Sequence, residues 1–242
     1  MDRIASRKNK TAGENDAMMV KNWMSQPAIT VDVLTSVKDA DRLAKWHEIH
    51  MLPVLQKGRL VGVVTDRDLK SASASDVSRK KINKNRHALA DREVQKIMTP
   101  DPVTVRYDCT LEEAVEKLLV HNITGLPVVN QQQKVIGVIT QSDLFQWILI
   151  LTGYGKKGLQ LALEVEDLPE RLRTITDIIR DYGGRISSLF STPEQAERGN
   201  RRLYMRIFGI DQPSLQHLKE VIRKKATLLY IVDHNEKKRE CF

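Results

Sequence analysis

Cysteine, aromatic residues and long apolar runs are all scarce in this chain of 242 residues. Its two cysteines, Cys109 and Cys241, are too few for a disulfide scaffold or a thiolate zinc site, and they suit a reducing cytosol. The apolar run Trp147–Leu151 falls far short of the roughly 20 residues that a membrane helix needs. Residues 1–17 lack the apolar core of a secretory signal, so we expect a disordered extension on a cytoplasmic protein.

The remaining composition is that of an ordinary globular chain. Hydrophobic residues make up 41% and charged residues 29%, which argues against a disordered chain. The length allows one or two domains with a sizeable core. The net charge of +8 hints at an anionic ligand, but it is too diffuse to indicate nucleic acid.

An internal repeat organises the first half of the chain, at an offset of 74 to 75 residues. Three motifs recur in the same order: a Met six residues before a Thr-Val pair, a Leu-Pro-Val triplet, and a Gly-apolar-apolar-Thr-x-x-Asp-Leu segment. They occupy 24–31, 52–54 and 62–69 in the first copy, and 98–105, 126–128 and 137–144 in the second. The second copy has one extra residue between 130 and 134, where a hairpin loop tolerates an insertion.

Each copy predicts the order β-α-β-β-α. In the second copy, Thr110 and Glu113 have the spacing of a capping box at the start of the first helix, and the second helix begins at Gln141. One such unit of about 55 residues is too small to be stable alone, so we expect the two copies to share a core. The predicted boundaries are 18–72 for repeat one, 73–91 for a linker with a basic stretch at 79–86, and 92–152 for repeat two.

The third unit has a different pattern. Residues 153–158 match Gly-x-Gly-x-x-Gly, but a helix precedes them and a strand follows, the reverse of a dinucleotide loop, so they are interpreted as a linker. Residues 159–234 predict β-α-β-β-α-β, a ferredoxin-like plait, followed by a tail at 235–242. One face of such a sheet is uncovered by helices, and it commonly pairs with another subunit.

On these motifs, residues 18–152 resemble a tandem pair of CBS domains, the Bateman module. Residues 159–234 resemble an ACT domain in the order of their elements. The order CBS–CBS–ACT is similar to the bacterial acetoin-utilisation regulatory proteins. The expected fold class is therefore α/β (α+β), with a pseudo-symmetric CBS pair followed by an ACT-like domain.

The CBS resemblance implies an adenosine-containing ligand, such as AMP, ADP, ATP or S-adenosylmethionine, in up to two clefts between the repeats. It implies that Asp68 and Asp143 accept hydrogen bonds from both ribose hydroxyls, which suits the two acceptor oxygens of a carboxylate. Thr65 and Thr140 begin the helices that carry these residues, and they would lie near ribose or phosphate. Arg67 would face a phosphate.

The second copy has Ser142 in place of Arg67, which predicts a weaker phosphate site there. His50 stands where family members that bind AMP often carry a His-Arg pair, and Met51 replaces the arginine. The resemblance also implies an apolar slot for the adenine ring in each copy. The residues of the two slots are Thr30, Val31, Leu52 and Pro53, and Thr104, Val105, Leu126 and Pro127.

Each motif also has a purely structural interpretation. Thr followed three residues later by Asp is an ordinary helix start, and a Leu-Pro-Val strand packs into a core whether or not a ligand binds. ACT domains that bind amino acids usually carry a glycine in the loop after their first strand. This chain has 166–170 without a glycine there, which favours a dimerisation role for the third unit.

These observations predict a non-enzymatic sensor that requires no cofactor or metal and binds an adenosyl regulatory ligand. It is expected to act as a homodimer through the CBS pair and the ACT-like domain, with an unknown client. One alternative is a structural subunit with unoccupied clefts. Another is a nucleic-acid binder using the basic stretches 79–86 and 237–239, although aromatic residues for base stacking make up only 5% of the chain. No catalytic constellation is evident in the sequence, and we expect no membrane association.

Overall fold

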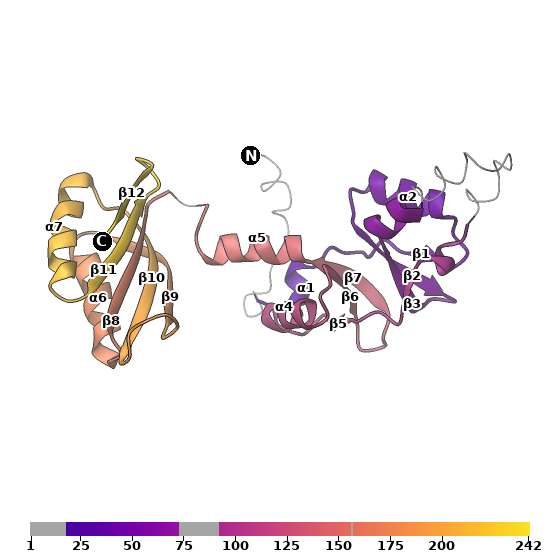
Figure 1. The fold of residues 1–242 in the computed structure, drawn as a ribbon, viewed down its shortest axis with the longest axis horizontal. Helices are drawn as coiled ribbons and strands as arrows, with labels where there is room; N and C mark the ends of the chain where they lie inside the picture. The colour runs from indigo at the N-terminus through magenta and orange to yellow at the C-terminus, as the bar shows by residue number, and fades with distance from the viewer. Residues whose placement is uncertain (1–17, 73–91, 156) are drawn as a thin grey trace. The chain divides into compact units, whose positions relative to one another are not determined.

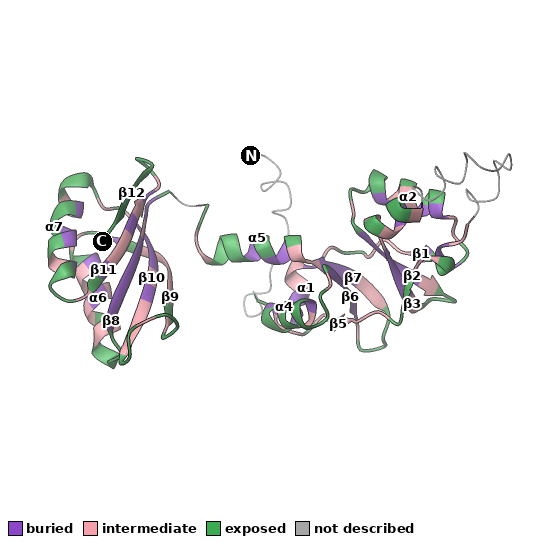
Figure 2. Ribbon diagram, in the orientation of Figure 1, coloured by how far each residue is buried: buried purple, intermediate pink, exposed green. Residues whose placement is uncertain are grey.

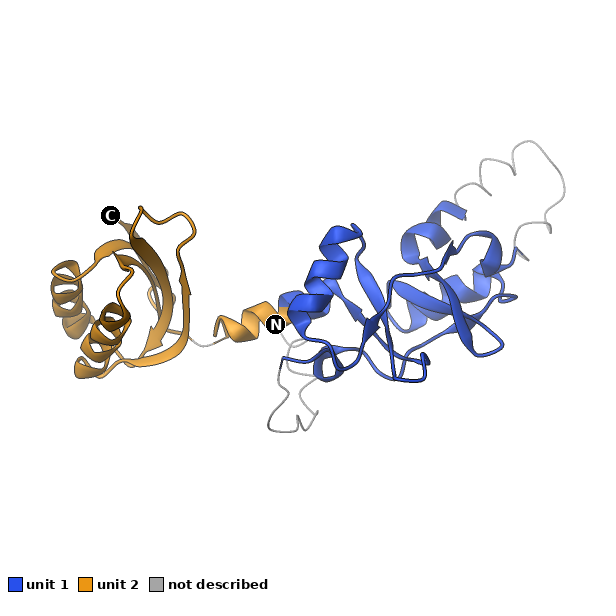
Figure 3. Cartoon of the chain, turned by 90° about the horizontal axis from the view of Figure 1, so that it is seen from below, with its two compact units in different colours: residues 1–145 blue, residues 146–242 orange. Residues whose placement is uncertain are grey.

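The computed structural model describes residues 18–72, 92–155 and 157–242, and it divides the chain into two compact units, 1–145 and 146–242 (Figure 3). The expected N-terminal extension and the linker with its basic stretch lie outside the described residues. The boundary between the units falls inside helix α5 (Gln141–Leu151), a few residues before the boundary expected at 152. None of the described helices combines the length and apolarity needed to cross a bilayer.

The first repeat has the expected order of elements (Figure 1). It contains α1 (Val20–Trp23), β1 (Val31–Asp32), α2 (Val37–Trp46), β2 (Met51–Gln56), β3 (Arg59–Thr65) and a helix described over 66–72. Helix α2 begins where the Ser36 hydroxyl accepts a hydrogen bond from the backbone N–H of Asp39. The turn between β2 and β3 places Lys57 and Gly58 at positive φ, as a tight hairpin requires.

The second repeat follows the same plan. It contains η2 (Val94–Lys96), β4 (Thr99–Pro100), β5 (Val105–Arg106), α4 (Leu111–Val120), β6 (Gly125–Val129), β7 (Val135–Thr140) and α5. The predicted capping box at the start of α4 is confirmed, because Thr110 and Glu113 each bond the other's backbone N–H. The registers also match between the copies: β1 runs parallel to β2 with Val31 opposite Val54, and β5 runs parallel to β6 with Val105 opposite Val128.

The leading segments of the two repeats are exchanged, which the sequence pattern did not predict. Ser25 forms a bridge with Val138 in β7 of repeat two. In return, β4, from the start of repeat two, pairs with β3 of repeat one, so that one sheet has the order β1-β2-β3-β4 and the other β5-β6-β7. Each half of the module therefore contains chain from both repeats.

In each exchanged segment, a methionine side chain packs against a glycine of the other repeat. A Cβ atom on Gly137 would lie 2.6 Å from the Met24 sulfur, and one on Gly62 would lie 2.5 Å from the Met98 sulfur. Such distances are shorter than real Cβ contacts, so any other residue at these positions would displace the methionine. The first and third motifs of the repeat therefore meet across the two copies.

The core of repeat one lies between its sheet and helices, where side chains are buried (Figure 2). Val31, Leu52, Val54 and Val64 belong to this cluster, together with Ala40 of α2. A second, smaller cluster joins Met51 and Val63 of repeat one to Val138 of repeat two. The two copies thus share apolar contacts, as expected for units too small to be stable alone.

The second unit has the predicted strand and helix order. It contains β8 (Leu159–Glu166), α6 (Pro169–Asp181), β9 (Arg185–Thr192), β10 (Asn200–Phe208), α7 (Gln212–Arg223) and β11 (Thr227–Asp233). Asp211 caps α7 by accepting from the N–H of Ser214 at 2.8 Å. Helices α6 and α7 lie on one face of the sheet, as Figure 1 shows.

The C-terminal tail differs from the expectation. Residues Lys238–Cys241 form a further strand, β12, antiparallel to β11, and the sheet order is β12-β11-β8-β10-β9. The buried ammonium of Lys219 in α7 donates to both carboxylate oxygens of Glu240 at 2.7 and 2.9 Å. This ion pair compensates the buried cation and links the added strand to α7.

Candidate functional site

The side chain of Asp68 is held by the residue that begins its helix. Its Oδ2 accepts hydrogen bonds from the backbone N–H and the hydroxyl of Thr65, at 2.8 and 2.7 Å, and its own N–H donates back to that hydroxyl at 3.3 Å. The structural interpretation of the Thr-x-x-Asp motif is therefore correct, because the pair forms a helix cap. The second oxygen, Oδ1, has no hydrogen bond to the described residues, so it offers two unused acceptor positions.

Repeat two reproduces this arrangement. Oδ2 of Asp143 accepts from the N–H and hydroxyl of Thr140 at 2.9 and 2.7 Å, and the Asp143 N–H donates to that hydroxyl at 3.4 Å. Asp143 is only 6% exposed, whereas Asp68 is partly buried. Each threonine hydroxyl donates its hydrogen bond to the aspartate, so it can contact a ligand only as an acceptor.

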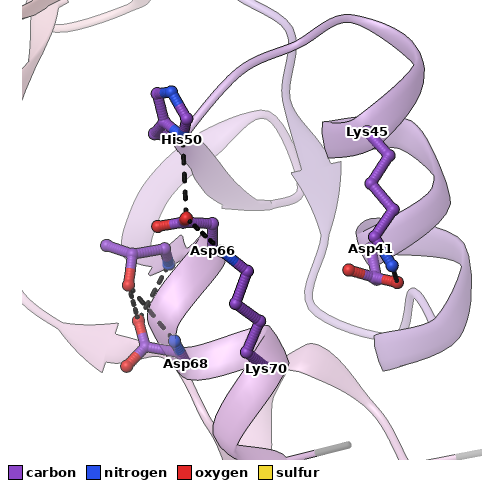
Figure 4. A network of polar contacts seen from close by, with 7 residues as sticks. Asp41, Lys45, His50, Asp66, Asp68 and Lys70 are labelled. Atoms are coloured by element: carbon purple, nitrogen blue, oxygen red, sulfur yellow. Dashed lines mark hydrogen bonds and ion pairs between the residues drawn. The ribbon is translucent and has the colours of Figure 1, made fainter.

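A charged network surrounds the first turn of the helix in repeat one (Figure 4). Asp66 forms an ion pair with Lys70 at 2.9 Å, and His50 Nδ1 lies 3.6 Å from the same carboxylate oxygen. The hydrogen bond from Lys70 lowers the pKa of Asp66 below its ordinary value. The side chain of Arg67 is exposed beside this network.

The corresponding helix start in repeat two has no charged side chains at the positions of this network. In repeat one the N–H of Asp66 donates to the carbonyl of His50 at 3.1 Å, and in repeat two the N–H of Gln141 donates to the carbonyl of Thr124 at 3.0 Å. These equivalent hydrogen bonds align the two helix starts. Ser142 and Phe145 then correspond to Arg67 and Lys70. Repeat two therefore lacks every ionisable group of the charged network in repeat one.

The predicted adenine slots consist of residues with two different roles. Val31 and Leu52 belong to the core cluster of repeat one, and Val105 and Leu126 are 1% and 0% exposed. Pro53 and Pro127 are also buried, and each lies next to a core leucine on its strand, so it faces the opposite side of the sheet. Val54 and Val128, the valines of the two Leu-Pro-Val strands, are both 0% exposed, so these strands pack into the core as the structural interpretation expects.

Thr30 and Thr104, which precede β1 and β5, are both partly buried. Their backbone carbonyls differ in hydrogen bonding. The ammonium of Lys117 in α4 donates to the carbonyl of Thr104 at 3.1 Å. Leu43 occupies the corresponding position in repeat one, so the Thr30 carbonyl receives no such bond. Sequence reasoning missed Lys117, because a lysine on a helix gives no signal of the carbonyl it reaches.

The boundary between the repeats also contains residues that sequence reasoning did not place there. Met51 and Gly125 occupy equivalent positions in the two repeats, and a Cβ on Gly125 would lie 3.0 Å from the terminal methyl carbon of Met51. A large residue of one repeat and a small residue of the other thus lie in close contact.

No group of three or more His, Cys, Asp or Glu side chains is placed to hold a metal ion among residues 18–72, 92–155 and 157–242. In the second unit, the loop after β8 is closed by its own contacts. The Arg171 guanidinium donates to Glu166, and the N–H of Asp167 donates to the carbonyl of Gly199 at 2.9 Å.

Three solved structures resemble the chain in fold. A CBS domain pair in complex with 5′-methylthioadenosine and S-adenosyl-L-methionine is 27% identical, with a TM-score of 0.46 over 54% of this chain and 98% of that one. CBSX2 in complex with AMP is 31% identical, with a TM-score of 0.44 over 54% and 96%. A Vibrio cholerae protein assigned to acetoin utilization (AcuB) is 24% identical, with a TM-score of 0.47 over 57% and 94%.

Curated relatives match the same part of the chain. L-aspartate semialdehyde sulfurtransferase of Methanocaldococcus jannaschii is 28% identical over 60% of this chain, and inosine-5′-monophosphate dehydrogenase of Korarchaeum cryptofilum is 34% identical over 52%. The chain spans only 26% and 23% of these two enzymes. The region of each enzyme that matches this chain is thus about a quarter of that enzyme's length.

The family itself is established by two findings. The CBS domain family model matches residues 20–75 and 94–150, which contain both Thr-x-x-Asp caps and both exchanged segments. A CBS domain-containing protein of Dictyostelium discoideum is 32% identical over 54% of this chain and 92% of its own length. Taken with the duplicated motifs and their matched registers, these findings show that the chain belongs to the CBS domain family.

Proposed function

We propose that this protein is a non-enzymatic regulator that binds an adenosine-containing ligand between its CBS repeats. The observation that carries the proposal is the pair of capped aspartates. Each carboxylate is held in one orientation by two hydrogen bonds from its threonine, and the backbone N–H of the aspartate donates back to the threonine hydroxyl. In Asp68 one oxygen is left with two acceptor positions. A ribose presents two adjacent hydroxyl donors, which is the complement of such an oxygen.

Preorganisation makes this arrangement favourable for binding. A carboxylate already fixed by its helix cap loses little side-chain entropy when a ligand arrives. The same contacts also serve the helix, so the cap alone does not require a ligand. The proposal therefore rests on duplication: the same cap stands at the same register in both copies, directly after a buried strand.

The two repeats are proposed to differ in the ligand charge they accept. In repeat one, Lys70 and His50 lie beside Asp66 at the helix start (Figure 4), and the next residue, Arg67, has an exposed side chain. These three basic side chains against one carboxylate favour a ligand with a phosphate. In repeat two the equivalent residues carry no charge, and Lys117 occupies the Thr104 carbonyl. Repeat two therefore favours a ligand whose 5′ substituent is not a polyphosphate.

For the second unit we propose an ACT-like domain that pairs two subunits of a cytoplasmic homodimer. Its support is the strand order β11-β8-β10-β9 with both helices on one face. The segment Thr152–Tyr154 contacts the other face at Ser188 and Arg206, and the rest of that face is proposed to meet the partner. Ligand binding would then favour one arrangement of the dimer by its differential affinity for the two arrangements. Sedimentation equilibrium tests the dimer, and a monomer at all concentrations would refute it.

The decisive experiment is a thermal-shift series on the whole chain. AMP, ADP, ATP, NAD, S-adenosylmethionine and 5′-methylthioadenosine are compared on the wild type and on the Asp68→Ala/Asp143→Ala double variant. A ligand at about 100 times its Kd stabilises the native state by about 2.7 kcal/mol, and this gain should disappear in the double variant. No shift with any nucleotide would instead support a structural subunit with unoccupied clefts.

A further inference from the structure

Arg206 of β10 is a buried cation on the face of the second unit that the helices leave uncovered. Its neighbours Met205 and Ile207 belong to the core beneath α6 and α7, so Arg206, between them on the strand, faces the other side. It is only 5% exposed. Gln160 of β8 and Ser188 of β9 lie directly opposite it on the two adjacent strands.

Two of the three guanidinium nitrogens have partners. Nε donates to the carbonyl of Thr152 at 3.0 Å, and Nη2 donates to Oε1 of Gln160 at 3.2 Å. The hydroxyl of Ser188 also donates to the Thr152 carbonyl, at 2.9 Å. Nη1 is fully buried and has no hydrogen-bond partner among the described residues. Two N–H groups of a buried cation are therefore left unsatisfied.

The other buried charges of this unit are all compensated. Glu164 accepts from the Glu197 N–H, from Asn200 and from Arg202. Lys219 is paired with Glu240, and Asp233 accepts from Gln212 and from two backbone N–H groups. Arg206 has no ion pair with a described residue, although an unpaired buried charge is costly. A fold that pairs its other buried charges thus leaves one cation without a counter-ion.

The groups around this cation suit a small polar ligand. The hydroxyl of Tyr230 accepts from the Gln160 amide at 3.1 Å, so its own proton is available to an acceptor. The ring of Tyr154 lies 5.7 Å from the guanidinium carbon and packs edge-on against His234. Tyr154 is 58% exposed, and an exposed ring changes rotamer on a nanosecond scale, which would open the cluster to solvent.

We propose that Arg206 and its neighbours form a binding site for a small molecule with one carboxylate group. Nη1 supplies two N–H donors, Tyr230 supplies a hydroxyl, and the ligand's single negative charge balances the single buried positive charge. A dianion such as phosphate would leave charge uncompensated at a site with one guanidinium. The site lies on the uncovered sheet face, away from the loop after β8, and it is independent of the proposed nucleotide site.

The test uses the full-length chain and a panel of named carboxylates: the proteinogenic amino acids, acetate, lactate and pyruvate. Each acid is compared with its amide, which has the same shape without the charge, in thermal-shift and calorimetric titrations. We expect at least one acid to bind and its amide not to bind. Arg206→Lys should weaken that binding by about tenfold or more, because lysine lacks the planar fork.

Arg202→Lys is the matched control, since Arg202 lies four residues earlier on the same strand and face and is already paired with Glu164. It should leave carboxylate binding unchanged, as should the Asp68→Ala/Asp143→Ala variant. If Arg206→Lys does not fold, side-chain NMR of the wild type labelled with ¹⁵N-arginine replaces it, and one guanidinium signal should move on titration. The proposal is wrong if no acid in the panel binds, or if acids and amides bind equally; Nη1 would then be satisfied by buried water.

Discussion

Asp68 and Asp143 combine two tasks in one side chain. One oxygen of each carboxylate caps a helix, which satisfies N–H groups that a helix start otherwise leaves unpaired. In the proposed site, the remaining oxygen of Asp68 meets a ribose. The stability and binding effects of a substitution can therefore be separated only with a variant that removes a cap and nothing else.

The capping box of α4 provides that variant. Glu113→Ala removes a cap that lies outside the proposed site, whereas Asp68→Ala removes a cap within it. Both should lower the free energy of unfolding by about 0.5–2 kcal/mol in urea denaturation. Only Asp68→Ala should weaken nucleotide binding, by about 10- to 150-fold in calorimetry, because charge-assisted hydrogen bonds contribute about 1.5–3 kcal/mol. Equal affinities in the two variants would exclude the ribose contact.

Arg67 tests the proposed difference in ligand charge. Arg67→Ser gives repeat one the residue that repeat two has as Ser142. Because the side chain is exposed, stability should be unchanged, while the affinity for AMP should fall about tenfold and that for adenosine should stay the same. Titrations at two salt concentrations check this, since the lost contact is ionic. An equal loss for AMP and adenosine would place Arg67 away from the phosphate.

At the level of secondary-structure elements, the exchange of leading segments joins the two repeats by backbone hydrogen bonds. Segment 24–28 pairs with β7 of the other repeat, and β4 pairs with β3. The methionine of the first motif occupies the space that a Cβ would need at the glycine of the third motif. The motif spacing that identified the repeat thus reflects packing between the copies as well as any ligand contact.

Substitution of these glycines measures the exchange directly. Gly62→Ala should lower the free energy of unfolding by about 1–3 kcal/mol, since overpacking displaces Met98. Adding Met98→Ala should recover part of this loss. Gly155→Ala is the control, because a Cβ there would meet nothing within 4 Å. Urea denaturation with no loss in Gly62→Ala would contradict the close contact between Gly62 and Met98.

The whole molecule consists of two compact units with separate cores. A ligand that binds one unit stabilises that unit by mass action, and it reaches the other only through a coupling free energy. The proposed nucleotide site belongs to the first unit and the proposed carboxylate site to the second. Their responses to ligand should therefore be separable.

Calorimetric melting of the full chain should show two transitions. An adenosyl ligand should raise the temperature of one, and Asp68→Ala/Asp143→Ala should abolish that rise. A carboxylate should raise the other, in an Arg206-dependent way. A single transition that both ligands raise together would show that the units unfold cooperatively, and the coupling free energy could then be measured from the reciprocal affinities.

Local patterns predicted much of the fold. The capping box at Thr110 and the Thr-x-x-Asp caps depend on neighbouring residues, so their signals lie within a few positions of the chain. The internal repeat also predicted the order of helices and strands in both copies. Of the candidate site residues, the capped aspartates are oriented as their spacing suggests, whereas Val31 and Leu52 turn out to be core residues.

What the sequence alone determined about this protein is the family motif, the element order and the helix caps, because these arise from interactions over short sequence separations. Only the tertiary structure decided which repeat each leading segment joins, that Lys117 reaches the Thr104 carbonyl, that the tail adds β12, and that Nη1 of Arg206 is buried without a partner. These depend on residues far apart in the chain. Their energies come from packing and desolvation, which are set only once the sheets have formed.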